Sequence, residues 1–181
     1  MNIWHDIAPE RISSTNFEVC VEIEKGGKVK YELDKDTGLL HLDRILYTST
    51  QYPANYGFIP RTYADDFDPL DVLIICSERI IPMTLVRCYP IGVITMIDNG
   101  RNDEKIIAIP FDDPAFNHVT DLPQLPHHIY DEMRHFFSVY KALENKETAV
   151  DEAEGAARAI EIIEGAIAQY KRLFAEYCSD K

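Results

Sequence analysis

The sequence predicts an α+β fold in which a sheet, closed into a barrel, is covered by two C-terminal helices. Short runs of alternating apolar and polar residues follow one another between residues 17 and 110, which is the pattern of β-strands. Beyond residue 128 the apolar residues recur about every 3.6 positions, which is the pattern of helices. Many short strands followed by helices are typical of α+β domains and barrels. Because no repeat or linker-like segment interrupts its 181 residues, the chain is expected to form a single domain, 1–181.

The first two strands are expected to form a hairpin. Residues 17–24 read FEVCVEIE and alternate apolar and polar side chains. Gly26 and Gly27 then supply a turn, and VKYELD (29–34) alternates again. A third strand is predicted in LLHLDRILY (39–47).

The later strands follow a long polar segment. Residues 48–71 are rich in Pro, Asn, Gly, Asp and aromatic residues, a composition typical of loops. The apolar runs VLIIC (72–76) and LVRCYPIGVITMI (85–97) are expected strands. IIAIP (106–110) is another, after a turn around Asn99-Gly100.

Two helical stripes of apolar residues follow, over 129–143 and 153–177. Both are expected to pack on the sheet, and an oligomer interface is the alternative. His128, Glu132 and His135 share one face of the first helix at i, i+4 and i+7. This face is expected to be helix surface or a subunit contact, because a third metal ligand is not evident in the sequence.

Charge and cysteine content exclude several classes of function. The 31 acidic residues exceed the 18 basic ones, for a net charge of −13, which is the opposite of the balance in nucleic-acid binders. The four cysteines form no CxxC pair, so a zinc site built on them is not expected. No apolar segment approaches the ~18 residues of a membrane span, and the first ten residues lack a signal-peptide pattern. We therefore expect a soluble cytoplasmic protein that binds neither nucleic acid nor a membrane.

The stretch ADDFDPLDVLII (64–75) places four carboxylates within seven positions, directly before an apolar strand. Two like charges about 4 Å apart repel by roughly 4 kcal/mol at an effective dielectric constant near 20. The cluster is either a solvated turn, which aspartates favour, or a cation site. An EF-hand loop starting at Asp66 is excluded, because its sixth and twelfth places hold Asp71 and Ser77. A phosphatase with an aspartate nucleophile is a weaker alternative, since FIPRTYAD before the motif is not a buried strand.

A second acidic pair strengthens the interpretation as a cation site. Asp98 and Asp103 flank NGRN, a short loop between two strands, and like charges opposite each other destabilise a sheet. Either the pair points to solvent, or it also faces Asp66 and Asp71, and four carboxylates converge. Such a group requires divalent cations or strongly raised pKa values. Oxygen ligands without imidazole or thiolate favour Mg²⁺ or Mn²⁺.

Cationic and phenolic residues accompany the acidic ones. Each alone is more often solvated or part of a core, but together with metal ions they are what a polyphosphate site requires. These candidates and the carboxylates near them are Glu22, Lys30, Glu32, Arg44, Tyr52, Tyr56, Lys105, Tyr140 and Lys141.

The string YPANYGFIPRTYADDFDPLDVL resembles the signature region of the soluble family I inorganic pyrophosphatases. The resemblance continues in VEIEKGGKVKYELDKDTG, LDR, IPMTLVRCYPIGVITMID and HFFSVYK, over residues 17–144. Two departures are Phe67, where the family usually has a small or polar residue, and the missing tryptophan-bearing stretch of the C-terminal helix. The resemblance implies a five-stranded OB-like closed barrel with additional hairpin strands and two C-terminal helices. It also implies Mg²⁺-dependent hydrolysis of pyrophosphate to two phosphates, and a homo-oligomer, commonly a homohexamer.

The resemblance further implies roles for the matching positions. Asp66, Asp71 and Asp103 match ligands of the principal metal, and Asp71 also contacts the second. Asp98, Asp103 and Glu32 match ligands of metals that arrive with substrate. Asp68 matches the base that accepts a proton from the attacking water. The resulting hydroxide is held by two metals and aimed in line at phosphorus. Substrate-binding positions are Lys30, Arg44, Tyr56, Lys105, Tyr140 and Lys141, and supporting positions are Glu22 and Tyr52.

Three other functions stay open on the residues alone. They are a non-catalytic binding module, a cation-dependent regulatory or scaffold protein, and a phosphatase for organic monoesters.

Overall fold

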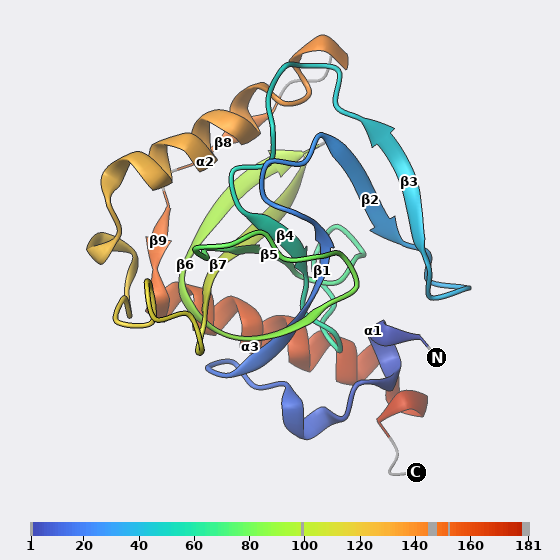
Figure 1. The fold of residues 1–181 in the computed structure, drawn as a ribbon. Helices are drawn as coiled ribbons and strands as arrows, with labels where there is room; N and C mark the ends of the chain where they lie inside the picture. Colours follow the sequence, from blue (N-terminus) through green and yellow to red (C-terminus); the bar gives the residue numbers. More distant parts are fainter. Residues whose placement is uncertain (1, 99, 145–147, 152, 179–181) are drawn as a thin grey trace.

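The computed structural model describes residues 2–98, 100–144, 148–151 and 153–178. Strands form a ring at the centre, one long helix crosses below it, a second helix lies along one side, and a two-stranded hairpin projects on the other side (Figure 1). The helices are α1 (Ile3–Asp6), α2 (His127–Val139) and α3 (Ala156–Leu173), with short 3₁₀ turns at Pro9–Arg11, Leu122–Gln124, Ala142–Glu144 and Ala175–Tyr177.

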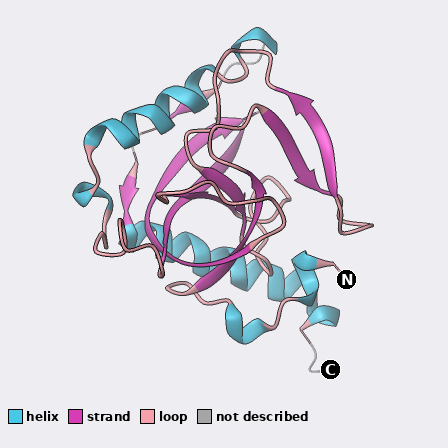
Figure 2. Cartoon of the chain, viewed as in Figure 1, coloured by secondary structure: helices cyan, strands magenta, loops and turns pink. Residues whose placement is uncertain are grey.

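The main sheet is mixed. Its strands are β1 (Phe17–Ile23), β4 (Asn55–Phe58), β5 (Asp71–Ile74), β6 (Leu85–Asp98), β7 (Arg101–Pro110), β8 (Ala149–Val150) and β9 (Glu154–Gly155). The strand order is β1-β4-β5-β7-β6-β8, with β9 also on β6; among the described residues, the β5–β7 pair is parallel and the other pairs are antiparallel. Because β1 pairs with β4 on one side and with β6 on the other, the pairings of five strands return to their start (Figure 2).

The predicted hairpin between residues 17–24 and 29–34 is wrong. β2 (Val29–Leu33) pairs with β3 (Leu40–Ile45) in a separate two-stranded sheet, while β1 joins the main sheet. The two glycines turn the chain away, since Gly26 N donates to Tyr52 O at 2.8 Å and Tyr52 N donates to Gly27 O at 2.9 Å. Both edges of β1 are then paired with other strands, and all of its residues except the partly exposed Glu18 are buried.

Strand β4 lies inside a segment predicted to be a loop. Gly57 is required there, because a Cβ atom at this position would lie 2.0 Å from Cys20 O of β1. Asn55 is fully buried, and its side chain accepts from Lys25 N at 3.0 Å and Ile80 N at 2.9 Å and donates to Glu78 O at 3.0 Å. Gly57 and Asn55, which give the segment its loop composition, therefore allow β4 to pack closely against β1 and bind it to neighbouring backbone groups.

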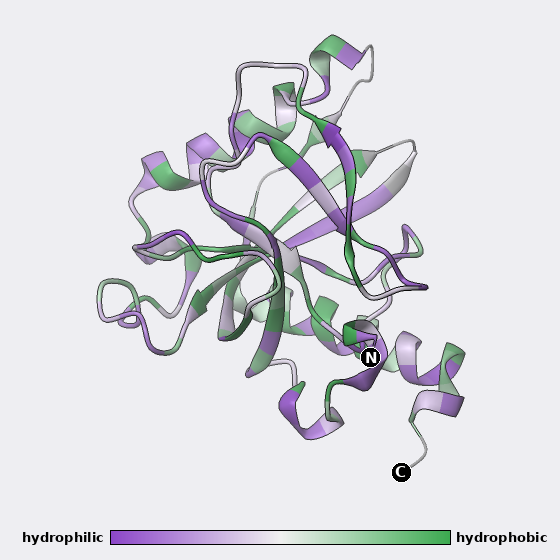
Figure 3. Cartoon of the chain, turned by 45° about the vertical axis from the view of Figure 1, so that its right-hand side comes forward, coloured by the Kyte–Doolittle hydropathy of each residue, from purple (hydrophilic) through white to green (hydrophobic). Residues whose placement is uncertain are grey.

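Both long helices cover the sheet, as the periodicity predicts. Met133, Phe136 and Phe137 of α2 belong to a core cluster that also contains buried residues of β6 and β7. Ala159 and Ile163 of α3 belong to a second cluster with residues of β1, β5 and β6. The helices carry both hydrophilic and hydrophobic residues, as expected of amphipathic helices that pack on a sheet (Figure 3). None of the helices in the described ranges combines the length and the apolarity needed to cross a membrane.

Candidate functional site

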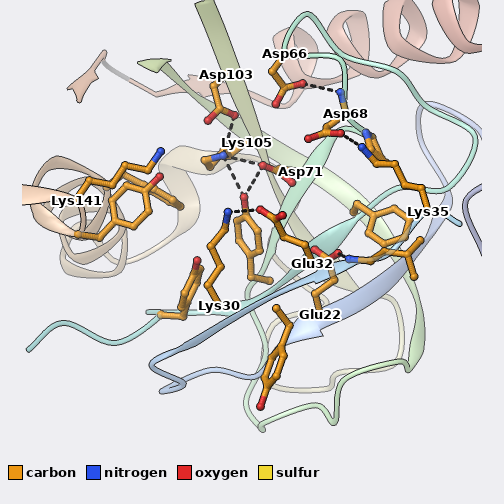
Figure 4. A pocket seen from close by; sticks show the side chains of 18 residues that line it. Glu22, Lys30, Glu32, Lys35, Asp66, Asp68, Asp71, Asp103, Lys105 and Lys141 are labelled. Atoms are coloured by element: carbon orange, nitrogen blue, oxygen red, sulfur yellow. Dashed lines mark hydrogen bonds and ion pairs between the residues drawn. The ribbon is translucent and has the colours of Figure 1, made fainter. Parts of the chain in front are cut away.

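A cavity of about 530 Å³ opens between β2, the 62–70 loop, β5, β7 and the end of α2 (Figure 4). It brings together twelve of the residues predicted from the sequence: Glu22, Lys30, Glu32, Tyr52, Tyr56, Asp66, Asp68, Asp71, Asp103, Lys105, Tyr140 and Lys141.

Among the predicted residues whose side chains the structure describes, Arg44 does not line the cavity. Arg44 lies on β3 opposite Lys30, and its guanidinium binds Asp43 at 2.6 Å and forms an ion pair with Glu144 at 3.0 Å. Asp98 ends β6, but its side chain lies outside the described part of the structure.

The Lys105 ammonium lies at the bottom of the cavity. It donates to Asp71 Oδ2 and Asp103 Oδ1, both at 2.8 Å, and to the Tyr56 hydroxyl at 3.1 Å. The parallel pairing places Asp71 opposite Lys105, and the two-residue period of β7 puts Asp103 on the same face. Burial lowers the pKa of Lys105, but the carboxylates of Asp103 and Asp71 outweigh it and hold the pKa well above its ordinary value. The site therefore contains a permanently charged, buried cation between two carboxylates.

The acidic loop is closed by a hydroxyl at its base. Thr62 Oγ1 donates to Ile59 O at 2.6 Å and accepts from Leu70 N at 2.9 Å. Within the loop, Asp66 Oδ1 accepts from Asp68 N at 3.1 Å. Phe67 between them has φ 76°, the left-handed region that favours small or glycine residues.

Negative charge is concentrated around Asp66. Burial, and then the charges of Asp71 and Asp103, raise the pKa of Asp66 to about 6. A cation beside this carboxylate would stabilise its ionised form and lower its pKa.

Basic side chains face this acidic side across the cavity (Figure 4). Lys30 of β2 forms ion pairs with Glu32 and with Asp43, the latter at 3.3 Å. Tyr140 and Lys141 follow α2, and the Lys141 ammonium lies 5.2 Å from the centre of the Tyr140 ring. The cavity can therefore bind cations on one side and phosphoryl oxygens on the other.

The donor chemistry fits hard divalent cations, although the carboxylates do not form a complete site as placed. Within the described ranges, no three His, Cys, Asp or Glu side chains are grouped so as to hold one ion. Asp71 and Asp103 share Lys105 instead, so a bound cation would compete with the ammonium for these two carboxylates. Carboxylate oxygens alone, without thiolate or imidazole, are the donor set of Mg²⁺ and Mn²⁺.

Glu22 supports the cavity from below. It is 7% exposed, and its Oε1 accepts from Leu33 N of β2 at 2.7 Å. Burial, and then the charge of Asp71, raise the pKa of Glu22 to about 8. Tyr52 is also buried, with its ring centre 5.3 Å from that of Tyr56.

The raised pKa of Glu22 predicts that the metal-free protein loses stability as pH rises. The folded state holds this proton more tightly than the unfolded state, so the stabilisation is complete below the unfolded pKa of 4.5 and is lost as pH approaches 8. The full loss is of the order of 3–5 kcal/mol. Urea unfolding at pH 5, 6.5 and 8 in EDTA should show that Glu22→Gln removes this part of the pH dependence. The matched variant Glu24→Gln, at an exposed position two residues further on, should retain it. An equal slope in wild type and Glu22→Gln would contradict the assignment.

The sequence did not indicate Lys35, which forms an ion pair with Asp68 in the cavity wall. Its string, DKDTG, is typical of a turn, where a lysine is usually solvated. No sequence signal distinguishes this lysine from the others, because its partner is 33 residues away.

Comparisons with known proteins agree on one family. A family model described as "Inorganic pyrophosphatase" matches residues 19–171. The chain is 48% identical over 169 residues to soluble inorganic pyrophosphatase 2 of Chlamydomonas reinhardtii, covering 93% of this chain and 88% of that protein. It is 50% identical over 175 residues to soluble inorganic pyrophosphatase 1 of Arabidopsis thaliana, covering 96% and 80%. Among solved structures, the inorganic pyrophosphatase of Helicobacter pylori superimposes with a TM-score of 0.85 at 39% identity, covering 94% of this chain and 98% of that one. The enzyme of Thermus thermophilus gives 0.86 at 34% identity, covering 94% and 99%.

Proposed function

The chain belongs to the family of soluble inorganic pyrophosphatases, which hydrolyse pyrophosphate, and we propose that it does so in the cavity around Lys105, with bound Mg²⁺. The observation that carries the proposal is the convergence of Asp71 and Asp103 on one buried ammonium, in a cavity that Lys30 of β2 and Lys141, which follows α2, also line. A diphosphate carries about three to four negative charges near neutrality. Its binding therefore needs both the cations that the carboxylates hold and the basic side chains of the protein.

The proposed cation ligands are Asp66, Asp71, Asp98, Asp103 and Glu32. Family I pyrophosphatases depend on divalent metals in general, and Mn²⁺ is a possible substitute for Mg²⁺ because both prefer oxygen donors. When bound, the cations supply an attacking water of lowered pKa and neutralise phosphoryl charge. The raised pKa of Asp66 supports this assignment, because the acidic side has more negative charge than Lys105 compensates.

The other side chains orient the substrate and move the proton. In the proposed reaction, water attacks one phosphorus in line with the leaving phosphate, and the Asp68 carboxylate accepts the proton. Substrate oxygens are bound by Lys30, Arg44, Tyr56, Lys105, Tyr140 and Lys141. Arg44 must exchange Asp43 and Glu144 for the substrate to take part. Glu22 and Tyr52 hold β2 and Tyr56 in place.

We also propose the fold, oligomeric state and location that accompany this activity. The ring of pairings supports a five-stranded OB-like closed barrel within one domain, 1–181. The protein is proposed to act in the cytoplasm as a homo-oligomer, a homohexamer, without binding nucleic acid or a membrane. Its net charge of −13 supports the exclusion of nucleic acid.

Phosphate release tests the proposal directly. Pyrophosphate, a nucleoside triphosphate and a sugar phosphate are compared, each with and without Mg²⁺. We expect rapid release from pyrophosphate with Mg²⁺ and at most slow release from the other two. Equal release from the sugar phosphate would indicate a monoester phosphatase, and Mg²⁺ binding without release would indicate a regulatory or scaffold protein.

A further inference from the structure

An ion pair joins the proposed base, Asp68, to Lys35, a lysine that the N-terminal residues Asn2 and Trp4 contact. Lys35 lies in the turn after β2 and lines the cavity, and its ammonium donates to Asp68 Oδ1 (Figure 4). The side chains are 42% and 55% exposed. An exposed pair of this kind contributes little on its own, so its geometry depends on how each partner is held.

Lys35 is held by its own turn and by the N-terminus. Asp34 Oδ1 accepts from Asp36 N at 2.9 Å, and Gly38 N donates to Asp34 O at 2.8 Å, which fixes the turn. Asn2 Nδ2 donates to Lys35 O at 2.6 Å. The ammonium lies 5.3 Å from the centre of the Trp4 ring, which is a cation–π contact.

The same tryptophan holds the acidic loop that carries Asp68. Trp4 is 5% exposed, and its Nε1 donates to Thr62 O at 2.9 Å. Arg61 N donates to Trp4 O at 2.9 Å. Thr62 in turn closes the loop through its bonds to Ile59 O and Leu70 N. One buried residue therefore fixes both the lysine and the loop that the lysine contacts.

From this arrangement we propose that Lys35 is a positioning residue for Asp68 in pyrophosphate hydrolysis. Binding of Oδ1 by the anchored ammonium fixes the carboxylate rotamer and directs Oδ2 to the proton of the attacking water. The inference rests on the proposed role of Asp68 as base. Without Lys35 the carboxylate rotates among its rotamers, and misplacement of a catalytic group by about 1 Å costs up to roughly 10²-fold in rate.

The test measures kcat and KM for pyrophosphate at saturating Mg²⁺ in Lys35→Met. We expect kcat to fall about tenfold with KM within twofold, and Lys35→Arg to recover at least half of the loss. Lys171→Met, the same change at an exposed position of α3, should match wild type. A crystal structure of Lys35→Met should show the Asp68 carboxylate in a different or mixed rotamer.

A double-mutant cycle separates this role from others. In the Asp68→Asn background, Lys35→Met should have no further effect on kcat, because its effect acts through the carboxylate. A full additional loss there would overturn positioning, and so would a rise in KM alone, which would mark a substrate contact. Wild-type kcat in Lys35→Met together with a slow Asp68→Asn overturns the inference and leaves the proposed function intact. Wild-type turnover in Asp68→Asn instead removes the base assignment itself.

Discussion

Asp68→Asn is expected to lower the turnover number for pyrophosphate by about 10²–10⁴-fold, the usual contribution of a general base. The amide keeps the shape of the side chain but cannot accept the proton. Asp68 is more than half exposed, so the variant should fold normally. Steady-state phosphate release at saturating Mg²⁺ gives the turnover number, and the melting temperature checks the fold.

A matched control is available three residues earlier. Asp65 is exposed and does not line the cavity, so Asp65→Asn removes the same charge from the same loop and should keep wild-type turnover. Wild-type turnover in Asp68→Asn would show that another group accepts the proton.

Removal of divalent cations is expected to abolish activity, and Mg²⁺ is expected to restore it. Cations that bind only the folded cluster also stabilise it, by about 2.7 kcal/mol at 100 times the dissociation constant. For a chain of this length that raises the melting temperature by roughly 5–10 °C. Thermal unfolding after EDTA treatment, with increasing Mg²⁺, measures the shift.

Two variants show whether the shift comes from the cavity. Asp71→Asn removes a proposed ligand and should reduce the Mg²⁺-induced shift, whereas Asp65→Asn should retain it. A melting curve that does not change across millimolar Mg²⁺ would contradict the proposed cation site.

Elements with a strong local period were predictable from the sequence. The strand predicted at 85–97 is β6, Leu85–Asp98, and the two helical stripes are α2 and α3. Their apolar spacing follows from one buried face, which the chain encodes residue by residue. The strand predicted at 106–110 begins five residues earlier, at Arg101. The apolar pattern missed its first half because that half is polar and supplies Asp103 and Lys105 to the cavity.

Strand partners were not predictable in the same way. The Gly26-Gly27 turn suggested a hairpin, but both edges of β1 pair with strands distant in sequence. In β4, the glycine and asparagine that weaken the strand pattern are needed because β1 approaches closely and nearby backbone groups must be satisfied. Such requirements come from neighbours, which a local pattern does not contain.

The sequence by itself determined the local chemistry: the spacing of Asp66, Asp68 and Asp71, and the alternation that puts Asp103 and Lys105 on one face of β7. Only the tertiary structure decided which charges meet. It placed Lys105 between two carboxylates, paired Arg44 with Glu144, and brought Lys35 to Asp68. The physical reason is that side-chain direction depends on the period of one strand or turn. Charge pairing instead depends on distances between segments, which the packing of the sheet and helices sets.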